Sequence, residues 1–120
     1  MLKKTITFPD YDGNSRTEDF YFHLSKAELM RMNFGESGGL EEKINRIVAA
    51  QDMPSIYKLF EDIVQNAYGV KSPDGRKFEK SPELLADFVQ TEAYSVLLEE
   101  ITSGAEAAVA FMNGIIPAAN

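Results

Sequence analysis

Apolar residues alternate with polar ones in two short stretches near the start of the chain, and a turn-rich segment centred on Asp12 and Gly13 separates them. This alternation predicts a β-hairpin over residues 2–24 with one apolar face. A two-stranded ribbon is marginal in water, so that face must pack on helices or on another copy of the chain. The alternating apolar positions are Leu2, Ile6, Phe8, Phe20, Phe22 and Leu24.

Helical periodicity replaces this alternation over residues 25–69. Ser25 and Glu28 have the spacing of a capping box, and a glycine-rich break follows at residues 33–39. A second amphipathic stretch covers residues 40–51, and Pro54 lies near the start of a third helix, which Gly69 is predicted to end. The third helix has the widest apolar stripe: Ile56, Leu59, Phe60, Ile63, Val64 and Ala67.

Residues 70–80 are predicted to form a loop, because they contain the turn tetrad Ser72-Pro73-Asp74-Gly75. Further helices are predicted over residues 81–117. Ser81 and Pro82 are typical of a helix start, and Ser103 with Glu106 fits a second capping box. Gly114 is expected to end the last helix in the left-handed conformation, with Pro117 preventing its continuation.

These patterns together predict an α+β fold that is mostly α. The N-terminal hairpin would pack on a bundle of about five or six short helices. The chain has 120 residues, no evident internal repeat and no low-complexity tract, so a single domain over residues 1–120 is the simplest interpretation.

Composition excludes several classes of protein. The chain has no cysteine, which removes disulfides, thiol catalysis and zinc-finger chemistry, and which suits a cytoplasmic protein. It has no run of about 18 apolar residues that would cross a membrane. Its first 20 residues are charged throughout, which argues against an export signal.

Charge argues against binding to nucleic acid. The net charge is −7, and all twelve basic residues lie between Lys3 and Lys80. A nucleic-acid interface needs clustered lysine and arginine, so none is expected here. Residues 81–117 carry six acidic and no basic side chains, so charge would steer a neutral or basic partner to them.

Catalytic and metal sites are not predicted. Asp10, Asp12 and Asn14 resemble the start of a calcium loop, but Ser15 and Tyr21 stand where that loop needs glycine and glutamate. His23 is interpreted as a surface residue of the hairpin that points away from its apolar face. No enzymatic activity and no cofactor are expected.

The remaining polar groups also have simple interpretations. Glu99 and Glu100 are adjacent on a helix and point about 100° apart, so they cannot form a carboxylate pair across a substrate. A small cluster of basic residues is interpreted as part of a solvated loop. The second interpretation is a salt-sensitive contact with an acidic protein surface. The members of the cluster are Lys71, Arg76, Lys77 and Lys80.

Five sequence motifs resemble one family. The C-terminal pair is F-x-Q-T-E-A-Y-S-x-L at residues 88–97 and F-x-N-G-I-I-P at residues 111–117. The others are K-K-T-I-T-F-x-D-Y-x-G-N at residues 3–14, T-E-D-F-Y-F-x-L-x-K-A-E-L at 17–29 and Y-G-x-K-S-P-D-G-R-x-F at 68–78. Together they resemble the tail assembly chaperones of long-tailed phages and prophages of Gram-positive bacteria.

The resemblance implies a non-enzymatic protein that acts in the bacterial host cytoplasm. Such a chaperone binds the long helical tape-measure protein, keeps it soluble, helps to bring in tail-tube subunits, and is absent from the mature virion. An alternative is a structural virion component, such as a head–tail connector or a tail-tube-associated protein. Self-association is left open, as is a longer form made by a ribosomal frameshift.

The apolar stripe of the C-terminal helices is the candidate partner-binding surface. It either completes the core of the chain or docks into a partner, and both hold if the last helix folds back when free and swings out on assembly. The candidate residues are Tyr94, Leu97, Leu98, Phe111, Met112, Ile115 and Ile116.

Overall fold

A computed structural model describes residues 1–34 and 39–116 of the chain. The strands in these residues are β1 (Leu2–Pro9), β2 (Ser15–Phe22), β3 (Tyr68–Lys71) and β4 (Phe78–Glu79). The helices are α1 (Lys26–Phe34), α2 (Gly39–Ala49), α3 (Met53–Ala67), α4 (Pro82–Val89), α5 (Glu92–Ile101) and α6 (Ala105–Ile115). The predicted α+β fold, mostly α and with an N-terminal hairpin, is therefore confirmed.

The hairpin leads into an antiparallel sheet of order β1-β2-β3-β4. In its turn, Gly13 adopts a φ of 87°, which favours glycine, and the carboxylate of Asp10 accepts the backbone N–H groups of Asp12 and Asn14. The Asp10 carboxylate, which resembles the first ligand of a calcium loop, thus stabilises the hairpin turn. Strand β1, which ends at Pro9, and the two-residue β4 form the edges of the sheet.

The prediction of a loop over residues 70–80 is wrong in part, because β3 and β4 form a second hairpin there. Helix α3 ends at Ala67, and Gly69 lies within β3 instead of ending the helix. A Cβ atom at Gly69 would lie 2.6 Å from Cε2 of Phe78 and 2.7 Å from the carbonyl oxygen of Glu79. Glycine is therefore needed for the close approach of β4.

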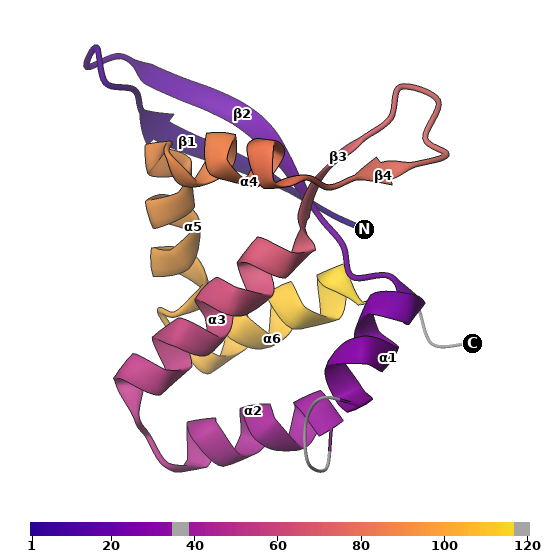
Figure 1. Ribbon diagram of the computed structural model, residues 1–120. Helices are drawn as coiled ribbons and strands as arrows, with labels where there is room; N and C mark the ends of the chain where they lie inside the picture. The colour runs from indigo at the N-terminus through magenta and orange to yellow at the C-terminus, as the bar shows by residue number, and fades with distance from the viewer. Residues whose placement is uncertain (35–38, 117–120) are drawn as a thin grey trace.

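Aromatic side chains fill the space between the sheet and the helices beneath it. Phe22 is fully buried, and its ring centroid lies 5.7 Å from that of Phe88 and 5.6 Å from that of Phe111. Tyr68 stacks on Phe88 with centroids 4.4 Å apart. Figure 1 shows α4 and α5 beside the β1–β2 hairpin, with α3 and α6 crossing the middle of the molecule.

Local signals start α1, α3 and α4 as predicted. Ser25 and Glu28 form the capping box, since each side chain accepts the backbone N–H of the other residue. The side chain of Asp52 caps α3 and that of Ser81 caps α4. Residues 35–38 of the predicted glycine-rich break lie outside the described residues, and α1 and α2 take up its two ends.

Two predictions about α6 are wrong. Gly104, not Ser103, precedes the helix, because the Ser103 hydroxyl donates to the carbonyl of Glu100 and closes α5. Gly114 does not end α6 but lies inside it, where a Cβ atom would be 2.9 Å from Cδ1 of Leu2. The expected role of Pro117 lies outside the described residues.

Helices α1 and α2 form what we term the helical arm. The α1 backbone approaches mainly that of α2, and α2 in turn approaches α3. In Figure 1 the arm lies across α3 and α6 from the hairpin. Its apolar side chains Leu29, Met32 and Ile47 are half-buried, and Met30 is 56% exposed.

Candidate partner-binding surface

Five of the seven candidate residues are buried in the core. Tyr94 is 8% exposed, and the other four, which are Leu97, Leu98, Phe111 and Ile115, are 3% exposed or less. Met112 and Ile116 are half-buried on α6 and at its C-terminal end. The structure therefore brings the candidates together, mostly facing inward.

Helix α6 is held in place by three kinds of contact. Phe111 packs its ring against Phe22, and Gly114 lies against the side chain of Leu2 on β1. The backbone N–H of Leu24 donates to the carbonyl of Ile115 with an N–O distance of 2.8 Å. The end of α6 is thus joined to the segment that follows β2.

Tyr94 anchors α5 to α3. Its hydroxyl donates to Oε2 of Glu61 at 3.0 Å and accepts from Nε2 of Gln65 at 3.1 Å. Burial, together with the carboxylate of Glu61, raises the pKa of Tyr94 to about 12. The tyrosine stays neutral at physiological pH and serves as a hydrogen-bonding link.

Carboxylates cover the outer surface of α4, α5 and α6. Five of the six are exposed, and Glu92 at the start of α5 is half-buried. Lys4 of β1 forms an ion pair with Glu100, with 2.6 Å between nitrogen and oxygen. The exposed carboxylates are Glu83, Asp87, Glu99, Glu100 and Glu106.

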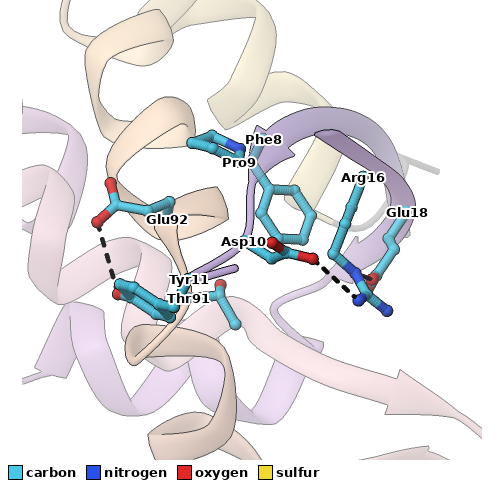
Figure 2. A pocket seen from close by; sticks show the side chains of 8 residues that line it. All are labelled: Phe8, Pro9, Asp10, Tyr11, Arg16, Glu18, Thr91 and Glu92. Carbon is cyan, nitrogen blue, oxygen red and sulfur yellow. Dashed lines mark hydrogen bonds and ion pairs between the residues drawn. The ribbon is translucent and has the colours of Figure 1, made fainter. Parts of the chain in front are cut away.

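A cleft opens between the hairpin turn and the start of α5 (Figure 2). Its volume is about 260 Å³, and its lining is mostly apolar. It is lined by Phe8, Pro9, Asp10, Tyr11, Arg16, Glu18, Thr91 and Glu92.

Polar groups at this cleft are partly paired. Arg16 donates to Glu18 at 2.9 Å and to Asp10 at 3.5 Å, and both carboxylates raise the pKa of its guanidinium. The hydroxyl of Tyr11 donates to the carbonyl of Gln90 at 2.9 Å. The turn is thereby tied to the junction of α4 and α5.

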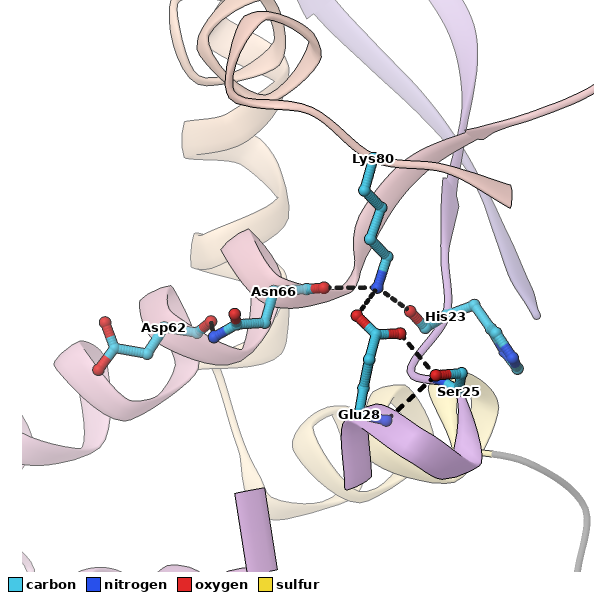
Figure 3. Close-up of polar contacts among 6 residues, drawn as sticks. All are labelled: His23, Ser25, Glu28, Asp62, Asn66 and Lys80. Atoms are coloured by element: carbon cyan, nitrogen blue, oxygen red, sulfur yellow. Dashed lines mark hydrogen bonds and ion pairs between the residues drawn. The ribbon is translucent and has the colours of Figure 1, made fainter. Parts of the chain in front are cut away.

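Lys80 joins four segments of the chain (Figure 3). Its Nζ atom donates to Oε2 of Glu28 at 2.6 Å and to the carbonyls of Asn66 at 2.7 Å and His23 at 2.8 Å. Lys80 is therefore a clamp between the helical arm, α3 and the sheet. Its interpretation as part of a solvated loop is wrong.

His23 lies just beyond β2 and is half-buried, whereas a surface position was predicted. Its ring meets that of Phe78 edge-on, with centroids 6.1 Å apart. Burial, followed by the positive charges of the N-terminus and Lys80, lowers the pKa of His23. The ring is therefore neutral near pH 7 and packs against the β3–β4 hairpin.

No group of metal-ligating side chains is found in residues 1–34 and 39–116. Over the same residues, no helix has the length and apolar character to cross a bilayer.

A family model described as phage tail assembly chaperone matches residues 1–119. The chain belongs to this family. No curated protein and no solved structure matches the chain. Membership identifies a tail assembly chaperone of a bacteriophage, with tail proteins as partners in general and a role in the host cell.

Two residues of this chaperone that position its surface were missed in the sequence. Tyr11 was assigned only to a turn and Lys80 only to a loop. The partners of Lys80 are at least 14 positions away in sequence, and Gln90 is 79 positions from Tyr11. Periodicity cannot detect pairings of this kind.

Proposed function

We propose that this tail assembly chaperone binds the tape-measure protein in the bacterial cytoplasm and covers its apolar surface. It then helps to bring in tail-tube subunits and is absent from the mature virion. The proposal includes no enzymatic step. The observation that carries it is the family match over nearly the whole chain.

Physical features of the chain support this role. A very long helical client exposes apolar seams that aggregate unless they are covered. A small acidic protein with apolar side chains on its helices can cover such seams reversibly. Val109 on α6 is 57% exposed, and Met112, three residues further along the helix, is half-buried. Helix α6 therefore offers apolar contact area.

In this proposal, helix α6 leaves its position on the sheet when the client binds. Its inner face, with Phe111 and Ile115, and the surface beneath it, with Leu97 and Leu98, then contact the client. Tyr94, Met112 and Ile116 complete the contact. Support comes from the apolar character of both sides of α6, since Val109 is 57% exposed while Phe111 and Ile115 are buried.

Co-expression tests the function directly. The tape-measure protein should become more soluble and should co-purify with the chaperone, while mass spectrometry of purified particles should not detect the chaperone. An insoluble client with no complex would contradict the proposal. Recovery of the chain at fixed stoichiometry in particles would support a structural component, such as a head–tail connector or a tail-tube-associated protein.

A reversible crosslink tests the release of α6. A Cβ atom on Gly114 would lie 3.3 Å from Cβ of Leu2, close to the range of about 3.5–4.5 Å in disulfides. The double variant Leu2→Cys, Gly114→Cys adds the only cysteines to the chain. Its oxidised form should not bind the client, whereas its reduced form and the two single variants should. Full binding by the oxidised form would contradict helix release.

A further inference from the structure

Tyr11 combines high exposure with a fixed position. It is 76% exposed, yet its hydroxyl donates to the carbonyl of Gln90 at 2.9 Å. Fixing an exposed side chain in one conformation costs conformational entropy, and the free protein already bears this cost at Tyr11. The ring therefore loses little further entropy when a partner binds. Exposed tyrosines of this kind are frequent at the energetic centres of protein interfaces.

The cleft beside Tyr11 has room for a side chain and is smaller than most ligand sites. Its volume of about 260 Å³ is smaller than the roughly 300–1,000 Å³ of sites for drug-sized ligands. Phe8, Pro9 and Tyr11 contribute ring surfaces, and Figure 2 shows Glu92 across from the Tyr11 hydroxyl. An elongated apolar stem fits such walls.

The net charge of the cleft lining indicates which kind of side chain can occupy it. The cleft has three carboxylates, Asp10, Glu18 and Glu92, and one guanidinium, Arg16, which gives a net charge of −2. Arg16 already pairs with Asp10 and Glu18. Within the described chain, the polar contact of the Glu92 carboxylate is the Tyr11 hydroxyl at 3.5 Å.

Among residues 1–34 and 39–116, the half-buried Glu92 carboxylate therefore has no charged partner. A wholly apolar occupant would strip water from its carboxylate without replacing the lost hydrogen bonds, and an acidic occupant would be repelled. A lysine or arginine side chain replaces the lost hydrogen bonds of the carboxylate and is attracted by its charge. Its stem lies on the apolar walls, and its cation reaches Glu92 beside the Tyr11 ring.

We propose that the cleft between the hairpin turn and α5 receives a lysine or arginine side chain from an amphipathic helix of the client protein. This inference rests on the proposed function and specifies one contact within it. Helices α4, α5 and α6 carry five acidic residues besides Glu92 and no basic residue of their own, and Lys4 of β1 pairs with only one of the five, Glu100. This charge favours a basic client segment.

Titration with a synthetic helical peptide tests the cleft without the client. The probe is an 18-residue amphipathic peptide of leucine, alanine and lysine, and its match has glutamine in place of lysine. The lysine peptide should bind the full chain and shift the amide resonances of Phe8 and of residues 10–18 and 90–93. The glutamine peptide should bind about tenfold more weakly.

Charge-matched variants separate the cleft from general acidity. Glu92→Gln should weaken lysine-peptide binding about tenfold, because it removes a charge-assisted contact in a half-buried position. Glu99→Gln removes the same charge from the exposed face of the same helix and should change binding less than about twofold. Equal losses in both variants, or no binding to the unaltered chain, would overturn the proposal.

A second pair of variants tests the aromatic wall of the cleft. Tyr11→Ala removes an exposed ring and should weaken binding about fivefold, whereas Tyr57→Ala, at a site that is 46% exposed on α3, should not. Co-purification of the client with Glu92→Gln at the unaltered level would contradict only this contact. Failure of the unaltered chaperone to bind the client would instead contradict the proposed function.

Discussion

The sheet with α4 and α5, here the sheet region, and the helical arm are stabilised in different ways. The sheet region packs the rings of Phe22, Tyr68 and Phe88 against one another. The arm has half-buried aliphatic and methionine side chains and is tied to the rest by the Lys80 clamp. Full burial of aromatic rings stabilises the sheet region, whereas the arm combines partial packing on the core with the Lys80 clamp. Moving the arm therefore exposes less apolar surface than opening the sheet region.

The largest expected effect comes from the aromatic cluster. Phe22→Ala should lower the free energy of unfolding by about 4 kcal/mol, because it leaves a cavity among three other rings. Urea unfolding followed by circular dichroism measures this loss. Met30→Ala in the arm, where the side chain is 56% exposed, should cost less than about 0.5 kcal/mol. Similar losses in the two variants would refute the contrast.

The second expected effect concerns the close approach of β3 and β4. Gly69→Ala should lower the free energy of unfolding by about 2 kcal/mol, because its Cβ would meet both a ring and a backbone oxygen. Gly104→Ala is the control, since nothing lies within 4 Å of a Cβ there. Thermal unfolding of both variants provides the measurement, and an unchanged midpoint for Gly69→Ala would show that β4 can shift freely.

The third expected effect is confined to the arm. Lys80→Met should cost about 1 kcal/mol, because it leaves the Glu28 carboxylate and the carbonyls of His23 and Asn66 without this donor. Hydrogen exchange should accelerate at the amides of α1, while the β1–β2 amides keep their protection. Uniform acceleration across both regions would mean that the clamp supports the whole fold.

The smallest expected effect is a pH dependence at the same clamp. Burial raises the pKa of Glu28, but hydrogen bonds from Lys80 and the Ser25 N–H outweigh it, so the pKa lies below its ordinary value of 4.5. A lowered pKa in the folded state stabilises the protein above pH 4.5, and this contribution is lost as the pH falls through the folded-state pKa.

Glu28→Gln provides the comparison for this pH effect. The unaltered chain should be more stable than the variant at pH 7, and the difference should shrink at pH 3. Chemical unfolding at the two pH values measures it. A difference that grows on acidification would show that the carboxylate is destabilising when charged.

Elements with regular patterns could be predicted from the sequence. The alternation around Ile6 and Phe20 predicted the hairpin, and the stripe that includes Leu59 and Ile63 predicted α3 with its buried face. In both cases the information is local, because one apolar side repeats at the period of the element. The capping pair Ser25 and Glu28 is local in the same way.

Features that depend on distant neighbours could not be predicted. Gly69 and Gly114 were both expected to end helices, yet each makes room for a segment far away in sequence. Strand β4 has two residues, which is too short for a detectable alternation. The cleft likewise depends on Tyr11 meeting Gln90, a pairing that only the folded chain reveals.

The two edges of the sheet bear on how this protein avoids recruiting extended chains. Strand β1 ends in a proline, which has no N–H to donate, and β4 is too short to template a new strand. Both features limit the addition of a further strand at the borders of the sheet. Under the proposed function, client contacts made by side chains of the helices and the turn can dissociate, whereas continuous backbone pairing would favour fibre growth.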